Sequence, residues 1–156
     1  MSSLQSRFCL FLCSMLFAAA SAHAQLSIEI TGAGAQRIPV AIVPFAGEGA
    51  VASGATTGIT PVVRADLERS GLFRAIEIPP LSPPPTEAST VDYAEWRARL
   101  ADALLVGSVG ARSDGRYEAR FRLYDVVKQA ALGGIAYTFT RSQVRATAHR
   151  IADFVY

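Results

Sequence analysis

The sequence predicts an α/β domain, a mixed β-sheet of about five strands with two to three helices packed on it and a hinged strand at its N-terminus. Two patterns predict this class. Apolar strand-like runs alternate with helical segments in the first half of the chain, as in parallel strand–helix–strand units. An Asp-Gly pair separates two strand-like runs in the second half, as in an antiparallel hairpin. The chain has 156 residues, 51% of them hydrophobic, which suits one compact core.

The first 24 residues have the three-part order of a secretory signal peptide. Arg7 precedes an apolar run over residues 8–20, and the small-residue pattern Ala22-His23-Ala24 precedes Gln25. The run is too short to cross about 30 Å of hydrocarbon. We therefore expect cleavage between Ala24 and Gln25, export of the chain, and no direct membrane insertion afterwards.

Charge and cysteine content exclude several functions. Fifteen basic residues balance 13 acidic ones, and their dispersal argues against a nucleic-acid partner or a polybasic membrane anchor. Both cysteines, Cys9 and Cys13, fall within the leader. The mature chain is therefore expected to have no disulfide framework, no thiolate metal site and no cysteine nucleophile.

Residues 25–36 are expected to form a detachable strand followed by a hinge. Leu26, Ile28 and Ile30 alternate with Ser27 and Glu29, as in a half-buried strand. The Gly/Ala stretch that follows makes a flexible joint. Such a strand can add to the edge of another protein's sheet. It can equally be the first strand of the domain's own sheet.

The first half of the remaining domain, residues 37–156, predicts a parallel strand pair. Residues 38–45 form a near-continuous apolar run, typical of a central strand. Thr60 and Pro61 supply an N-cap and a first helical position, and Gly71 ends that helix. Residues 72–78 form the next strand. Five of the seven residues 79–85 are proline, which predicts an extended connector.

The second half predicts a short helix and then an antiparallel hairpin. The helix covers residues 91–100, with Ser89 or Thr90 as its cap. Strands at 103–109 and 116–124 are joined by a two-residue turn at Asp114-Gly115. In the second strand, two sets of residues alternate. The set expected to face the core is Tyr117, Ala119, Phe121 and Leu123, and the set expected to face water is Arg116, Glu118, Arg120 and Arg122.

A further strand and a last helix complete the expected elements. The strand covers residues 132–140, with a bulge at Gly133-Gly134. Ser142 is expected to cap the helix. An apolar stripe runs along it: Val144, Ala148, Ile151 and Val155. No helix-ending signal precedes Tyr156, so we expect the chain to be a fragment of a longer protein.

Two motifs carry possible chemistry, and each has a simpler explanation. Residues 47–52 fit the pattern G-x-G-x-x-A of dinucleotide-binding loops, but Glu48 would place negative charge beside the phosphates. His149 and Asp153 share one face of the last helix. No second histidine remains in the mature chain to complete a metal site, so a surface pair supported by Arg150 is favoured. We expect no catalytic residues, metal or cofactor.

Several segments together resemble the N-terminal domain of the TolB family, periplasmic components of the Tol-Pal envelope system of Gram-negative bacteria. The most specific are DLERSG at 66–71, RLYD at 122–125 and HRIAD at 149–153, and the likeness covers residues 25–156. The resemblance implies an α/β domain followed by a six-bladed β-propeller, absent from this sequence, that binds the lipoprotein Pal. It also implies that the mature N-terminal strand docks on the C-terminal domain of TolA, and in this chain the corresponding residues are Gln25, Leu26, Ser27, Ile28, Glu29 and Ile30.

The resemblance thus implies a non-enzymatic periplasmic adaptor that helps constrict the outer membrane at division. A second hypothesis is a related periplasmic activator or secretion-accessory domain that acts through a rigid surface containing Arg120 or Arg122. A third is a small nucleotide-dependent enzyme that uses the loop at 47–52, and it predicts that Gly49→Val abolishes ligand binding.

Overall fold

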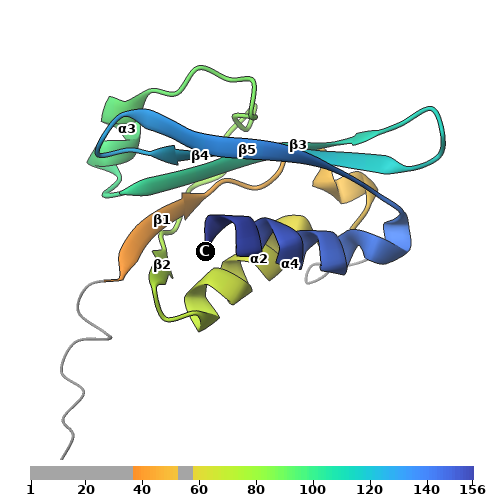
Figure 1. The fold of residues 1–156 in the computed structure, drawn as a ribbon. Coiled ribbons are helices and arrows are strands. Elements are labelled where there is room, and N and C mark those ends of the chain that lie inside the picture. Colours follow the sequence, from red (N-terminus) through yellow and green to blue (C-terminus); the bar gives the residue numbers. More distant parts are fainter. Residues whose placement is uncertain (1–36, 53–57) are drawn as a thin grey trace, which may run out of the picture. The chain divides into compact units, whose positions relative to one another are not determined.

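The computed structural model describes residues 37–52 and 58–156 (Figure 1). The leader with its expected cleavage site, and the strand and hinge expected at 25–36, lie outside the described residues. The described elements, in chain order, are β1 (Ile38–Ile42), the 3-10 turn η1 (Glu48–Ala50), α2 (Ile59–Arg69), β2 (Phe73–Ala75), α3 (Tyr93–Ala98), β3 (Ala103–Ala111), β4 (Tyr117–Asp125), β5 (Ala130–Phe139), the 3-10 turn η2 (Arg141–Gln143) and α4 (Val144–Val155).

One mixed sheet organises the described residues, with strand order β2-β1-β3-β4-β5. β1 runs parallel to both β2 and β3, whereas β3, β4 and β5 form an antiparallel series. The predicted α/β class, the parallel first pair and the antiparallel hairpin are therefore confirmed. β1 and β2 are shorter than expected, and β1 ends before Pro44 because a proline has no N–H for the ladder.

The two faces of the sheet are covered differently (Figure 1). We call the face covered by α2 and α4 the helical face and the opposite one the open face. The main core lies on the helical face and includes Ile42, Leu67, Leu105, Phe121 and Ile151, each at most 2% exposed. On the open face, α3 covers only part of the sheet, where Trp96 packs in a second cluster with residues such as Ala41, Leu104 and Tyr124. Among the described helices, none is long and apolar enough to cross a membrane.

Three helix caps differ from those expected. α2 begins after Gly58, and the Thr60 hydroxyl instead accepts a hydrogen bond from Phe45 N at 2.9 Å. α3 is capped by Asp92, which lies nearer the helix than Ser89 or Thr90 and accepts from Ala94 N and Glu95 N at 3.0 and 3.1 Å. In both helices a side chain other than that of the expected cap residue accepts hydrogen bonds from N–H groups of the first turn. The side chain of the expected cap residue can therefore form other hydrogen bonds.

The last helix is approached through η2 rather than capped by Ser142. Thr140 N donates to Gln143 Oε1 at 2.9 Å, and this pairing of N-cap and third residue belongs to a capping box. The expected apolar stripe of α4 is confirmed, since Val144, Ala148, Ile151 and Val155 are all buried.

The turn between β3 and β4, enclosed by the Arg112–Arg116 pair, has three residues (113–115) instead of the expected two. Arg112 N donates to Arg116 O at 2.8 Å, and Gly115 N donates to Arg112 O at 3.2 Å. Only Gly115 adopts a left-handed conformation there, with φ 78°, whereas the expected two-residue turn needs positive φ at two positions. The bulge in β5 is confirmed, because its register with β4 shifts beside Gly133.

Candidate functional site

The six residues expected to bind a partner, residues 25–30, lie outside the described part, so the structure leaves that prediction untested. Four other features of the described residues are candidates for function: the loop at 47–52, the His149 region, the open face near the β3–β4 hairpin, and an apolar groove at one end of the sheet.

The loop at 47–52 does not have the geometry of a phosphate cradle. Glu48 Oε2 accepts a hydrogen bond from Thr60 N at 2.9 Å, so a carboxylate already occupies the N-terminus of α2. That position is where a phosphate would receive backbone N–H bonds. Ala46, the residue just before the loop, hydrogen bonds to β3, because its N–H donates to Gly107 O at 3.0 Å and its carbonyl accepts from Val109 N at 2.7 Å. Ala46 therefore extends the sheet, and Glu48 of the loop occupies the start of α2.

His149 pairs with α2, not with Asp153 as its spacing suggests. Its Nδ1 hydrogen bonds to Asp66 Oδ2, and Arg69 Nη1 contacts Asp66 Oδ1 at 2.8 Å. Burial by itself raises the pKa of the Asp66 carboxyl, but the hydrogen bonds and charges of His149 and Arg69 outweigh it and hold that pKa below its ordinary value. Asp66 is then ionised near neutral pH, so His149 Nδ1 is the donor.

This arrangement joins two helices and offers no metal site. The neighbouring Arg150, expected to support a His149–Asp153 pair, instead stacks over the Tyr137 ring with its guanidinium carbon 4.1 Å from the centroid. Among residues 37–52 and 58–156, no group of three or more His, Cys, Asp and Glu side chains could hold a metal ion. The pair therefore fastens α4 to α2.

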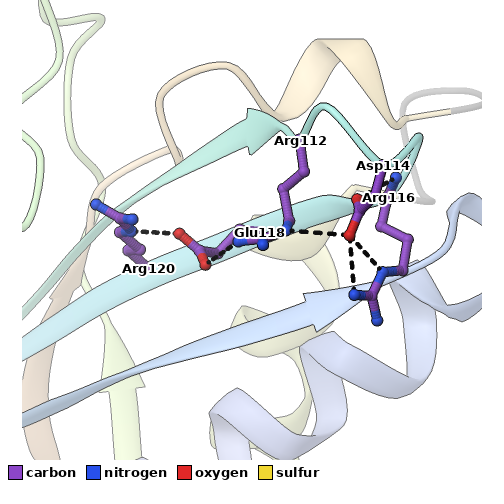
Figure 2. A network of polar contacts seen from close by, with 5 residues as sticks. All are labelled: Arg112, Asp114, Arg116, Glu118 and Arg120. Atoms are coloured by element: carbon purple, nitrogen blue, oxygen red, sulfur yellow. Dashed lines mark hydrogen bonds and ion pairs between the residues drawn. The ribbon is translucent and has the colours of Figure 1, made fainter.

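The open face carries a charged network near the β3–β4 hairpin (Figure 2). Glu118 binds two arginines, with Arg112 Nη1 at 3.0 Å and Arg120 Nε at 2.5 Å. At the turn, Arg116 Nη2 contacts Asp114 Oδ2 at 2.9 Å. The hydrogen bonds from Arg116 and the charges of Arg116 and Arg112 lower the pKa of the Asp114 carboxyl.

A separate contact on the same face joins β3 to the segment that follows the proline-rich connector. Ser108 Oγ donates to Glu87 Oε2 at 2.7 Å. An open cavity of about 420 Å³ lies between these groups. It is lined by Glu87, Ser108, Gly110, Ala111, Arg112, Ser113, Glu118 and Arg120. Most of its charges are already paired with one another, and its hydroxyls have no histidine beside them, so it offers no nucleophile and base.

An apolar groove of about 420 Å³ lies at the end of the sheet where β1 begins. Several of its apolar side chains are solvent-exposed, and Leu72 at 49% and Leu132 at 58% are two examples. Its lining comprises Ile38, Leu72, Phe73, Asp102, Ala103, Leu123, Asp125, Val127, Leu132, Val155 and Tyr156. Sequence reasoning missed this groove, since its lining comes from six segments that only the fold brings together.

The fold defines a small α/β domain with a mixed five-stranded sheet, and its described residues contain no catalytic constellation. Comparison with known proteins then identifies the family. The profile described as "TolB amino-terminal domain" matches residues 26–132, and the chain belongs to this family of Tol-Pal system components.

Individual relatives support the same assignment. The Tol-Pal system protein TolB of Aromatoleum aromaticum is 55% identical over all of this chain and 35% of its own length. That of Dechloromonas aromatica is 52% identical over 94% of this chain and 33% of its own length. The crystal structure of TolB from Acinetobacter baumannii superposes with a TM-score of 0.62 at 30% identity, over 82% of this chain and 29% of that one. The chain therefore spans about a third of the length of these relatives.

Proposed function

We propose that this chain is the N-terminal domain of a non-enzymatic periplasmic adaptor that docks on the C-terminal domain of TolA through residues 25–30. The observation that carries the proposal is the family match, which begins at residue 26 and so includes residues 26–30 of this segment. Export by the leader at 1–24 supplies the periplasmic location. Pal is reached through the propeller that the resemblance places after this domain, and the two contacts together serve outer-membrane integrity and constriction during division.

Backbone pairing supplies the physical basis for docking on TolA. A six-residue strand is about 20 Å long and forms about four to six inter-strand hydrogen bonds of about 1 kcal/mol net each. Leu26, Ile28 and Ile30 share one side of such a strand and add burial against the partner. After the cost of ordering the segment, affinity in the micromolar range is expected.

Titration of purified TolA C-terminal domain against the mature chain tests this proposal. Deleting residues 25–30 is expected to abolish binding in calorimetry, and Ile28→Glu to weaken it at least about tenfold, because a charge replaces a buried side chain. Ser27→Ala is the matched control, since Ser27 lies on the opposite side of the strand and its backbone is unchanged. Full binding by the deletion variant would overturn the proposal.

A second candidate function is favoured by the exposed arginines on the open face. Both Arg120 and Arg122 are exposed, as an activator or secretion-accessory domain acting through a rigid surface requires. This alternative predicts the reverse pattern: binding to the physiological partner survives deletion of residues 25–30 and is lost in Arg120→Glu or Arg122→Glu. The same set of variants thus separates the two functions.

A further inference from the structure

Within the sheet formed by the described residues, β5 is an edge strand without the usual protection against pairing with other chains. It is ten residues long and lies at one end of the strand order. Its sequence, AALGGIAYTF, contains no charged residue and no proline. Natural edge strands commonly carry lysine, proline or a bulge that discourages a further strand. Here the bulge lies beside Gly133, so residues 134–139 remain regular.

The hydrogen-bond alternation shows which β5 backbone groups point outward. Arg112 N bonds Arg116 O at one end of the β3–β4 ladder, and Val126 N bonds Asp102 O at the other. In an antiparallel ladder the bonded pairs recur every second residue, so the even-numbered residues of β4 bond to β3. The odd-numbered ones then bond to β5. Between the bulge and the end of β5, over residues 134–139, the outward N–H and C=O groups therefore belong to the even-numbered residues, which include Ala136 and Thr138.

Side chains on the open face beside this edge are basic and accessible. Arg122 lies opposite Gly134 in the β4–β5 register, and Arg120 lies opposite Ala136. No bulky side chain separates either arginine from the edge. Arg120 is paired with Glu118, whereas Arg122 has no carboxylate within ion-pair distance among the described residues. Gly134 is required in this place, because a Cβ there would lie 2.3 Å from Phe121 O.

The helical side of the same edge carries mainly apolar side chains, together with the Arg150 guanidinium stacked over the Tyr137 ring. Ile135 is 40% exposed and Leu132 is 58% exposed. Ile135 faces the main core side, since it pairs with the buried Phe121. A strand laid along β5 would therefore meet Ile135 on the helical side, with Arg150 further along at Tyr137, and Arg120 and Arg122 on the open side.

From these observations we propose that residues 134–138 of β5 accept an extended segment of another protein whose side chains alternate between apolar and acidic. Its backbone pairs with Ala136 and Thr138, its apolar residues cover Ile135, and its acidic residues face Arg122. A second copy of this chain is a poorer match for this edge, because its own β5 has no acidic residue to face Arg122. The proposal does not depend on residues 25–30.

The probe for this site is a capped six-residue peptide that alternates isoleucine and glutamate, titrated against the mature chain by fluorescence anisotropy. We expect it to bind at least about tenfold more tightly than the same peptide with lysine in place of glutamate. Arg122→Glu is expected to reverse this preference. Arg145→Glu on α4 is the matched control, because it makes the same exchange at another exposed arginine and should leave the preference unchanged.

Hydrogen exchange supplies a second, position-specific readout. Added peptide is expected to slow exchange of the outward Ala136 and Thr138 amides, while the inward Ile135 and Tyr137 amides, already bonded to β4, stay unchanged. Ala136→Pro removes an outward donor without removing a β4 bond and is expected to weaken binding at least about tenfold, with Ala136→Ser as its control. Equal binding of both peptides, or protection away from β5, would overturn the proposal.

Discussion

Strand β4 presents two different environments on its two sides. On the helical face, Ala119, Phe121 and Leu123 are buried without interruption. On the open face the exposed Arg120 and Arg122 are followed by Tyr124, which is only 6% exposed. Along this face of β4, the side chains change from exposed to buried where the strand passes beneath α3.

The difference between the faces follows from what covers them. Two helices of 11 and 12 residues cover the helical face, whereas the described part of the open face is covered by a single helix of six residues and by apolar residues of the segment before it. Burial of apolar area is the main source of folding free energy, so stability is concentrated on the helical face. The uncovered part of the open face keeps its arginines in solvent. It is available for recognition at little cost to the fold.

The strongest test of this comparison replaces two neighbouring residues, one on each side of β4, by alanine. Phe121→Ala removes a side chain that is 2% exposed and packs against Phe154 with ring centroids 5.1 Å apart. We expect it to lower the free energy of unfolding by about 3–5 kcal/mol. Arg122→Ala should change it by less than about 0.5 kcal/mol. Urea titrations of both variants measure these values, and similar losses in the two would show that the faces do not differ in this way.

A smaller, pH-dependent effect is expected between the two helices of the helical face. The folded pKa of Asp66 lies below its ordinary value, so its ion pair stabilises the native state above the unfolded pKa. That contribution is lost as pH falls through the folded pKa. We therefore expect the stability difference between the parent chain and Asp66→Asn to be present at pH 5 and to disappear progressively in more acidic solution.

Unfolding of both chains by urea across that acidic range measures the effect. Asp153→Asn is the matched control, because it removes a carboxylate from an exposed position of α4 that forms no ion pair among the described residues. A difference for Asp66→Asn that stays constant down to the most acidic point would contradict the assigned role of the pair.

The sequence was sufficient for the class of fold, because periodicity and turn chemistry are local signals. The alternation in β4, the stripe on α4 and the glycine pair at the bulge were each visible within about ten residues. Caps were less predictable. Thr60 is a good N-cap by type, yet its hydroxyl bonds Phe45 N, a group 15 positions away in the chain. Such a competing partner is visible only in the folded chain.

The candidate surfaces were harder to predict for the same reason. Spacing along α4 suggested Asp153 as the partner of His149, but the partner is Asp66, 83 positions away. The exposure of Arg120 and Arg122 was predicted from alternation. Their position beside the small residues of the β5 edge depends on the β4–β5 register, which the sequence does not show. Residues 25–30 remain a prediction from their alternating pattern and the family resemblance.

The smallest expected effect concerns the end of α3, the helix that covers the open face. Leu100 has a left-handed backbone with φ 62° and is 74% exposed, and Ala101 N bonds back to Trp96 O at 3.1 Å. A left-handed residue with a Cβ costs about 1–2 kcal/mol, partly offset in glycine by its greater chain entropy. Leu100→Gly should therefore stabilise the domain by up to about 1 kcal/mol. Leu72→Gly is the control, because Leu72 is an exposed leucine with negative φ, and it should destabilise the domain. Urea unfolding measures both variants. A lower free energy of unfolding in both would show that backbone strain at Leu100 does not reduce the stability of the domain.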